Sequence, residues 1–295
     1  MIVDCHTHID CGSDAADTAG HLSVAQMVDM CVVLGGLEDG SEKVNKRLSD
    51  YVRNHEDKMV GFAVVEPTKD QIALSDLEML KDEMGFRGAI LYCSACGFHP
   101  AHSRAIRFYE AAQELGMPVF FHNGGGDLGS DAVLEYAQPY LLDEVARMFP
   151  KLKVVIGNMG VPFVEQTLSM VGKHSNVYAD LTMRPSSVWQ LYNTVVSAHE
   201  RCVMDKLLFG SGFPLGNPQQ CMETLLGFNM LLADTNLPGV PRNNIRGIIE
   251  RDTLSVLEIA GGDSGGIESG TAEGRTARKR TKKGSGTEEG GAAAQ

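Results

Sequence analysis

The sequence predicts a protein of the α/β class, a closed (β/α)₈ or TIM barrel, and three observations support this prediction. Eight apolar or β-branched runs recur along the chain. Stretches with apolar residues at spacings of three and four, typical of amphipathic helices, separate them. Most of the runs are almost continuously apolar, which indicates parallel strands covered on both faces. Eight repeats favour a closed barrel over an open doubly wound sheet.

The first expected strand is the run "IVDCHTHID", residues 2–10. The other seven are expected at 30–36, 59–67, 86–92, 118–126, 152–160, 176–182 and 206–214. Helices are expected between them at 23–30, 41–55, 70–84, 103–116, 131–149, 162–174, 186–200 and 217–233. A last amphipathic segment, 243–261, is expected to seal the barrel.

Composition and charge favour a small-molecule partner over a nucleic acid or a membrane. Residues 1–261 hold 20 basic and 33 acidic side chains, a formal charge of about −13, whereas phosphate contacts need clustered Lys and Arg. No run of 18 apolar residues and no signal-peptide pattern is present. We therefore expect a cytoplasmic protein. The seven cysteines fit reduced thiols, and a homo-oligomer is expected because dimers are common.

Composition changes abruptly after the barrel segment and divides the chain into two parts. Residues 1–261 are expected to form the barrel, and residues 262–295 a disordered, Gly-rich tail whose single large aliphatic residue is Ile267. Six of the nine residues 275–283 are Lys or Arg. This basic cluster is expected to be solvated, with a weak contact to RNA or another anionic partner as the alternative.

Polar side chains stand at the expected C-terminal ends of several strands, where barrels of this kind place their reactive groups. His6 and His8 project to the same face of the first strand because side chains alternate along a strand. The fifth strand ends in His122, the sixth in Asn158, the seventh in Asp180, and the eighth in Ser211, Gly212 and Phe213. Three neutral imidazoles suffice to hold a catalytic zinc ion with one open position. We therefore predict one divalent metal ion, Zn²⁺, bound by His6, His8 and His122.

Five motifs make the chain resemble a known superfamily over about residues 1–261. They are "DCHTHID", "GFRGAILYCSACGFHP", "GMPVFFHNGG", "FPKLKVVIGNMGVPF" and "LLFGSGFPLGNP", in order and at barrel-strand spacing. The chain resembles the amidohydrolase superfamily, and in particular the amidohydrolase 2 branch. That branch also includes decarboxylases similar to aminocarboxymuconate-semialdehyde decarboxylase.

The resemblance implies a degenerate metal site. The family pattern has His-x-His on strand one, His on strands five and six, and Asp on strand eight. This chain matches it at His6, His8 and His122, but Asn158 stands at the strand-six position and Gly212 at the strand-eight position. Strand four, with Ile90 and Tyr92, also lacks the Lys and His of many relatives. The resemblance therefore implies a mononuclear site without the carboxylate that handles a proton.

Other residues are candidates to complete the site. Asn158 is expected to polarise the substrate through its amide, and Asp180 is expected to replace the missing carboxylate, with Glu66 and Asp127 as alternatives. Arg184 is expected to hold a substrate carboxylate, and Asn123 is a second substrate-binding candidate. Weaker hypotheses place Cys93 or Cys96 as a thiolate ligand and His99 or His102 near the substrate. The remaining histidines receive no role: His21, His55, His174 and His199.

Three functions remain open at this stage. The first is a metal-dependent hydrolase acting on a carbonyl or amide-like bond of a small molecule. The second is a metal-dependent, non-oxidative decarboxylase of an acidic substrate, in which Arg184 anchors the carboxylate. The third is a catalytically impaired pseudoenzyme or ligand-binding scaffold, for which the changes at Asn158 and Gly212 are the evidence.

Overall fold

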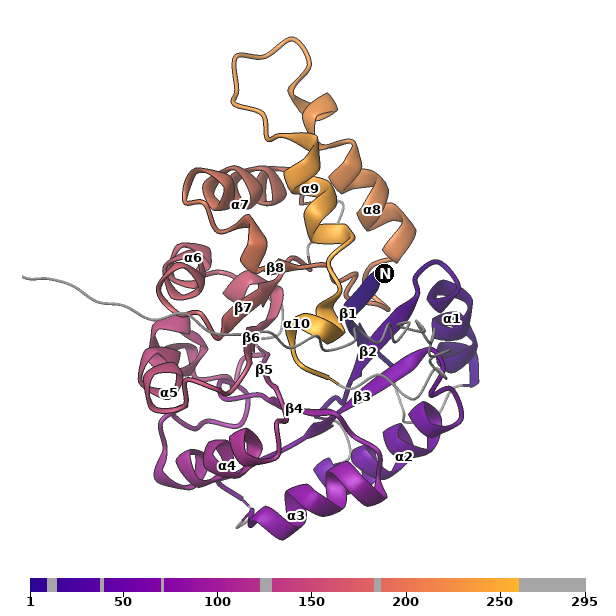
Figure 1. Cartoon of the computed structure of the whole chain (residues 1–295), viewed down its shortest axis with the longest axis vertical. Helices are drawn as coiled ribbons and strands as arrows, with labels where there is room; N and C mark the ends of the chain where they lie inside the picture. Colours follow the sequence, from indigo (N-terminus) through magenta and orange to yellow (C-terminus); the bar gives the residue numbers. More distant parts are fainter. Residues whose placement is uncertain (10–14, 38–39, 70–71, 123–128, 183–186, 260–295) are drawn as a thin grey trace, which may run out of the picture. The chain divides into compact units, whose positions relative to one another are not determined.

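The computed structural model describes residues 1–9, 15–37, 40–69, 72–122, 129–182 and 187–259. Within them, eight parallel strands form one sheet in the order β1 to β8, and helices surround it (Figure 1). The predicted TIM barrel is confirmed. The predicted tail, 262–295, lies outside the described residues, so its boundary and its weak anion contact stay predictions.

The strands are short and almost fully buried. Their bounds are β1 Val3–His8, β2 Met30–Leu34, β3 Met59–Val64, β4 Gly88–Leu91, β5 Val119–Phe121, β6 Val154–Ile156, β7 Val177–Asp180 and β8 Leu207–Leu208. Every residue of β3, β4, β5 and β6 is buried. This burial on both faces explains why the runs are apolar without alternation.

Backbone hydrogen bonds between β1 and the segment after β8 close the barrel. Cys5 N donates to Phe209 O at 2.9 Å, Gly212 N donates to His6 O at 2.8 Å, and His8 N donates to Phe213 O at 2.8 Å. The buried carboxylate of Asp4 adds a fourth link, because its Oδ1 accepts from Ser211 N at 2.8 Å. The seam therefore runs directly past both histidines of β1.

Helices follow the strands around the outside of the barrel (Figure 1). The α-helices are α1 Ala15–Ala25, α2 Ser41–Arg53, α3 Leu74–Glu78, α4 Ser103–Glu114, α5 Leu142–Met148, α6 Val164–Lys173, α7 Val188–Glu200, α8 Pro218–Leu226, α9 Arg242–Ile249 and α10 Thr253–Val256. A π-helical turn, η1 (Met79–Glu83), extends α3, and a 3₁₀ turn, η5 (Gly157–Gly160), follows β6. Residues in and after α10 pack against the side chains that fill the barrel interior.

Several predicted boundaries are wrong. The first helix was expected at 23–30, but α1 covers Ala15–Ala25, and the chain then turns into β2. The expected helix 131–149 is interrupted near Pro139, whose nitrogen has no hydrogen to donate, and only Leu142–Met148 is α-helical. The expected final helix is divided into α9 and α10.

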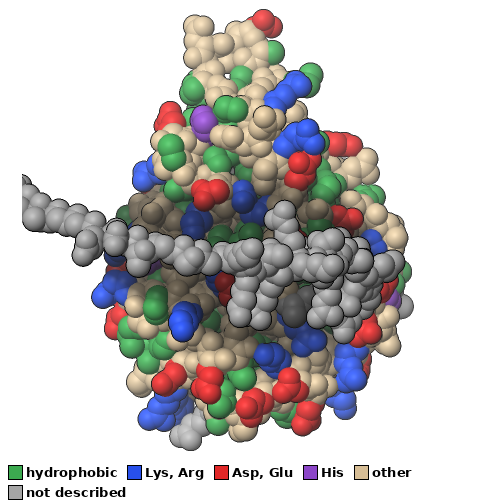
Figure 2. All heavy atoms as spheres, viewed as in Figure 1, with side chains coloured by type: hydrophobic (Ala, Val, Ile, Leu, Met, Phe, Trp, Pro, Cys, Tyr) green, Lys and Arg blue, Asp and Glu red, His purple; other side chains and the backbone are tan. Residues whose placement is uncertain are grey.

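The surface carries mixed charge. In the face shown in Figure 2, acidic and basic side chains are interspersed over the helices, most densely along the lower edge near α3 and α4. No helix of the described residues is long and apolar enough to cross a membrane. None of the six cysteines that the structure describes forms a disulfide. The cytoplasmic location and the homo-oligomeric state stay predictions.

The barrel interior supports a first prediction, on stability. Phe62 of β3 is fully buried in the interior cluster and meets the ring of Phe120 edge to face. Phe62→Ala leaves a cavity, and we expect it to lower the free energy of unfolding by about 3–5 kcal/mol, measured by urea denaturation. Leu215→Ala is the control, because Leu215 is 72% exposed. Equal losses in the two variants would contradict the interior packing described here.

Candidate metal centre

A β-bulge in β1 lies at the first predicted ligand. Asp4 pairs with Cys31 and Thr7 with Val33, so Cys5 and His6 together face the single residue Val32 of β2. The side chain of Asp4 accepts from His6 N at 3.3 Å. Bulges of this kind redirect side chains beside functional sites.

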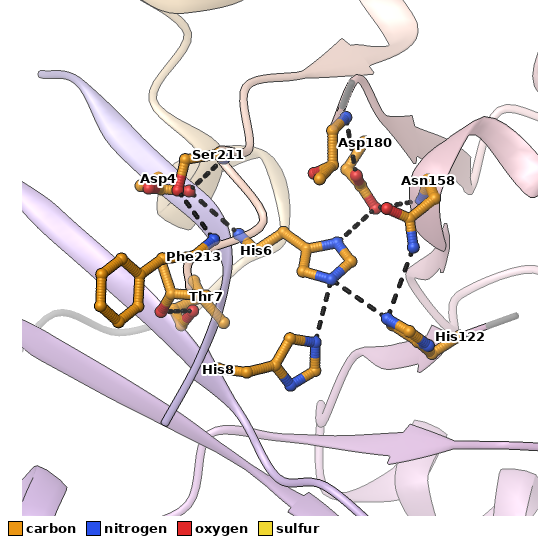
Figure 3. A network of polar contacts seen from close by, with 11 residues as sticks. Asp4, His6, Thr7, His8, His122, Asn158, Asp180, Ser211 and Phe213 are labelled. Atoms are coloured by element: carbon orange, nitrogen blue, oxygen red, sulfur yellow. Dashed lines mark hydrogen bonds and ion pairs between the residues drawn. The ribbon is translucent and has the colours of Figure 1, made fainter. Parts of the chain in front are cut away.

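The three predicted metal ligands converge on one point (Figure 3). His6 Nε2 lies 3.0 Å from His8 Nε2 and 3.2 Å from His122 Nε2. Ligand nitrogens bound to one zinc ion at 2.0–2.1 Å lie about 2.9 Å apart at right angles and about 3.3 Å apart in a tetrahedron. Among the described residues, these three form the one group of side chains with the spacing of a metal site.

The hydrogen bonds behind two of the rings fix which nitrogens face one another. His6 Nδ1 lies 3.2 Å from Asp180 Oδ2, and His8 Nδ1 lies 3.1 Å from Leu34 O. Both partners are acceptors, so each Nδ1 carries the hydrogen. In the neutral rings, the lone pairs of His6 Nε2 and His8 Nε2 then point at each other across 3.0 Å. A positive charge between them, a proton or a metal ion, removes this repulsion, and the donor set fits a divalent metal.

Burial keeps the imidazoles available as ligands. Desolvation by burial, with a smaller effect of the neighbouring His6, lowers the pKa of His8 from 6.5 to about 3. Burial also places the pKa of His122 well below its ordinary value, with His6 and His8 acting in the same direction. Both rings are therefore neutral at pH 7, which is the form that binds a metal.

Asp180 and Asn158 lie beside the histidines and contact them. Asp180 ends β7, is fully buried, and accepts through Oδ2 from His6 Nδ1 and from Asn158 N at 2.9 Å. Its Oδ1 accepts from Thr182 N at 3.0 Å. The side-chain amide of Asn158 lies 3.4 Å from His122 Nε2. Asp180 thus stands behind His6, on the Nδ1 side, whereas the Asn158 amide stands on the side of the Nε2 atoms.

A comparison with protein families adds an independent observation. The family model described as amidohydrolase matches residues 3–238. The chain belongs to the amidohydrolase family. The resemblance carried by the five motifs is therefore confirmed. No curated protein sequence matches the chain.

Solved structures with the same fold include hydrolases and decarboxylases by name. A probable 2-pyrone-4,6-dicarboxylic acid hydrolase from Acinetobacter baumannii, with citric acid bound, is 16% identical with a TM-score of 0.63, covering 87% of this chain and 99% of its own. A dihydroxybenzoic acid decarboxylase from Polaromonas sp., with bound manganese and the inhibitor 2-nitroresorcinol, is 14% identical with a TM-score of 0.60. The match covers 88% of this chain and 97% of the decarboxylase. A 2,6-dihydroxybenzoate decarboxylase from Rhizobium is 13% identical with a TM-score of 0.61, and the match covers 88% of this chain and 98% of the decarboxylase.

The strand-eight position of this amidohydrolase is closed to a side chain. Gly212 has a φ of +68°, and a Cβ there would lie 2.6 Å from Thr182 Cγ2. A Cβ at Gly210 would collide with Thr182 Oγ1 and approach His6 Cβ to 2.8 Å. Thr182 therefore fills the space beside both glycines. The strand-eight position of this chain therefore combines a left-handed glycine with a threonine packed against it.

The strand-six position is also unusual in its backbone. Asn158 and Met159 have φ values of 50° and 53°, so the chain makes a left-handed turn directly after β6. Asn and His are among the residues that adopt this conformation most readily. The predicted strand 152–160 ends at Ile156 for this reason.

The remaining sequence candidates divide into two groups. Asn123, Asp127 and Arg184 lie outside the described residues, so their roles stay predictions. The second group lies within the described residues and consists of Glu66 and the candidates in the loop after β4. The carboxylate of Glu66 contacts Lys69 Nζ at 2.5 Å and Cys96 Sγ at 3.4 Å.

The alternative ligands in the loop after β4 are poorly suited to a metal. Burial raises the pKa of Cys93 well above its usual range and that of Cys96 to about 12, so both are neutral thiols at pH 7. His99 Nδ1 accepts from Ala101 N, and His102 Nδ1 accepts from Arg104 N at the start of α4.

Sequence reasoning missed His21, to which it gave no role. This histidine of α1 is fully buried, and its Nε2 lies 3.0 Å from Thr7 Oγ1. Thr7 is the residue between the proposed ligands His6 and His8 in the sequence. Its Nδ1 lies 2.8 Å from the hydroxyl of Tyr51. The predicted first helix began at residue 23, so no periodicity placed His21 against β1.

His21 also supports a prediction on pH. Burial, with a smaller effect of His55, lowers the pKa of His21 from 6.5 to about 4. Because the unfolded chain takes up the proton first, the stability from neutral His21 is complete above pH 6.5 and is lost as the pH falls toward 4. We expect the free energy of unfolding of metal-free His21→Gln, measured by urea denaturation, to depend less steeply on pH than that of the wild type in this window, by up to about 1.4 kcal/mol per pH unit. Parallel pH profiles of the two free energies would contradict this assignment.

Proposed function

We propose that this amidohydrolase is a metal-dependent hydrolase acting on a carbonyl or amide-like bond of a small molecule. His6, His8 and His122 hold one divalent ion in this proposal. Zn²⁺ is the first candidate, and Mn²⁺ is the second because a structural neighbour was solved with manganese. The observation that carries the proposal is the convergence of three Nε2 atoms, two of which face each other at 3.0 Å with their Nδ1 hydrogens already donated.

Each residue has a distinct task in this proposal. A divalent ion bound there lowers the pKa of water and polarises a carbonyl oxygen. Asp180 holds the hydrogen on His6 Nδ1 and so keeps Nε2 free for the ion. The Asn158 amide donates to the substrate oxygen on which negative charge develops. Arg184 and Asn123 are proposed to bind the remainder of the substrate.

Decarboxylation is the second candidate, and the strand-eight position favours it. Hydrolysis needs a base that accepts the proton of the attacking water, and Gly212 supplies none. Loss of CO₂ from an acidic substrate needs no activated water, and the carbon that loses CO₂ takes up a proton that solvent can supply. The same fold occurs in proteins named as decarboxylases and in one named as a hydrolase, which is compatible with both candidates.

The metal site gives a direct prediction. Chelator-treated protein should bind Zn²⁺ or Mn²⁺ at one ion per chain, measured by elemental analysis after gel filtration, and its Tm should rise with ion concentration because the ion binds the native state. His122→Ala should lose this binding. His102→Ala is the control, because His102 is exposed and caps α4. If the wild type binds no stoichiometric metal and its Tm does not rise, the metal-dependent enzyme is excluded and the ligand-binding scaffold is the remaining interpretation.

Asn158 gives a prediction on catalysis. A panel of lactones, amides and aromatic acids, assayed separately for hydrolysis and for CO₂ release, identifies the reaction. With the substrate found, Asn158→Gly should lower kcat by about 10²–10³ while metal binding is retained, since glycine accepts the left-handed backbone and removes only the amide. Asn158→His, which also tolerates this backbone, should restore part of the rate. An unchanged kcat in Asn158→Gly would remove this residue from the reaction.

A further inference from the structure

A directed chain of hydrogen bonds runs from α2 through α1 and β1 to β2. It begins at the hydroxyl of Tyr51 in α2, 2.8 Å from His21 Nδ1. His21 Nε2 lies 3.0 Å from Thr7 Oγ1, and Thr7 Oγ1 donates to Val32 O at 2.8 Å. Thr7 and His21 are both fully buried.

The direction of every hydrogen bond in this chain is determined. Thr7 has one hydroxyl hydrogen, which Val32 O receives, so Thr7 must accept from His21 Nε2. With its hydrogen on Nε2, neutral His21 accepts from the Tyr51 hydroxyl through Nδ1. A buried network in which all members are satisfied holds one conformation more firmly than separate bonds do.

The chain ends at the bulge that orients the metal ligands. Thr7 Oγ1 bonds the carbonyl of Val32, the residue that stands opposite both Cys5 and His6. On its other side, the ring of His21 packs on Phe213 with centroids 5.3 Å apart, and Phe213 O accepts from His8 N. The network therefore contacts both neighbours of β1, and it does so between His6 and His8.

We propose that Thr7 and His21 are positioning residues of the metal centre. They hold the β1 bulge in the one register that keeps the Nε2 atoms of His6 and His8 close enough to share an ion. The inference rests on the proposed metal site and adds to it a support that touches neither metal nor substrate. Groups of this kind commonly contribute a factor of about 10–100 to metal affinity.

Co²⁺ is the probe for this inference, because its visible absorption reports the geometry of its ligands. Thr7→Val removes the hydroxyl at nearly constant volume, and we expect it to bind Co²⁺ about 10- to 100-fold more weakly, with an altered visible spectrum. Thr7→Ser keeps the hydroxyl and should restore the affinity and the spectrum. Thr253→Val is the matched control, since Thr253 is a fully buried threonine of α10 whose hydroxyl makes no hydrogen bond with the residues that the structure describes. It should bind Co²⁺ as the wild type does.

Two further variants keep the test decisive if Thr7→Val does not fold. His21→Leu interrupts the chain one step away, and Tyr51→Phe two steps away, so Co²⁺ affinity should fall in both and less in the second. A wild type that binds no Co²⁺, Zn²⁺ or Mn²⁺ overturns the proposed function. A wild type that binds Co²⁺, with variants of Thr7, His21 and Tyr51 that match it in affinity and spectrum, overturns the positioning role alone.

Discussion

The close approach of two imidazole nitrogens, with His6 Nε2 only 3.0 Å from His8 Nε2, is the constraint on which the rest of the site depends. Asp180 and Leu34 O take the Nδ1 hydrogens, so His6 and His8 cannot relieve the contact by exchanging tautomers. The backbone positions of both histidines are fixed, because β1 is bonded to β2 on one side and to the segment after β8 on the other. The architecture therefore maintains an arrangement that is unfavourable without a cation.

The repeat of strands and helices could be predicted from the sequence because it depends on local periodicity. Buried parallel strands are apolar throughout, and amphipathic helices show a spacing of three and four, so the barrel and the meeting of His6, His8 and His122 follow from order along the chain. Boundaries depended on finer features. Pro139 interrupts a periodic segment, and the left-handed turn at Asn158 ends β6 early. Periodicity alone does not report either feature.

The supports of the site could not be predicted, because they depend on contacts between distant segments. The bulge at His6 is a shift in the pairing register between β1 and β2. The sequence of one strand does not determine how the neighbouring strand pairs with it. His21 reaches Thr7 from another element, and only the packing of α1 on the barrel brings them together. The position of Asp180 behind His6 is similar, since strand order placed it at the mouth without showing which nitrogen it meets.

Thr182 limits which residues can stand at position 212. Its side chain occupies the volume that a residue at Gly212 would need, and the backbone of Gly212 has adopted a conformation that other residues rarely tolerate. An aspartate at residue 212 would therefore bring its Cβ to 2.6 Å from Thr182 Cγ2 unless the Thr182 side chain moved. The effects of substitutions at Gly212 and Thr182 are therefore expected to be coupled. A carboxylate at the strand-eight position requires changes at both residues.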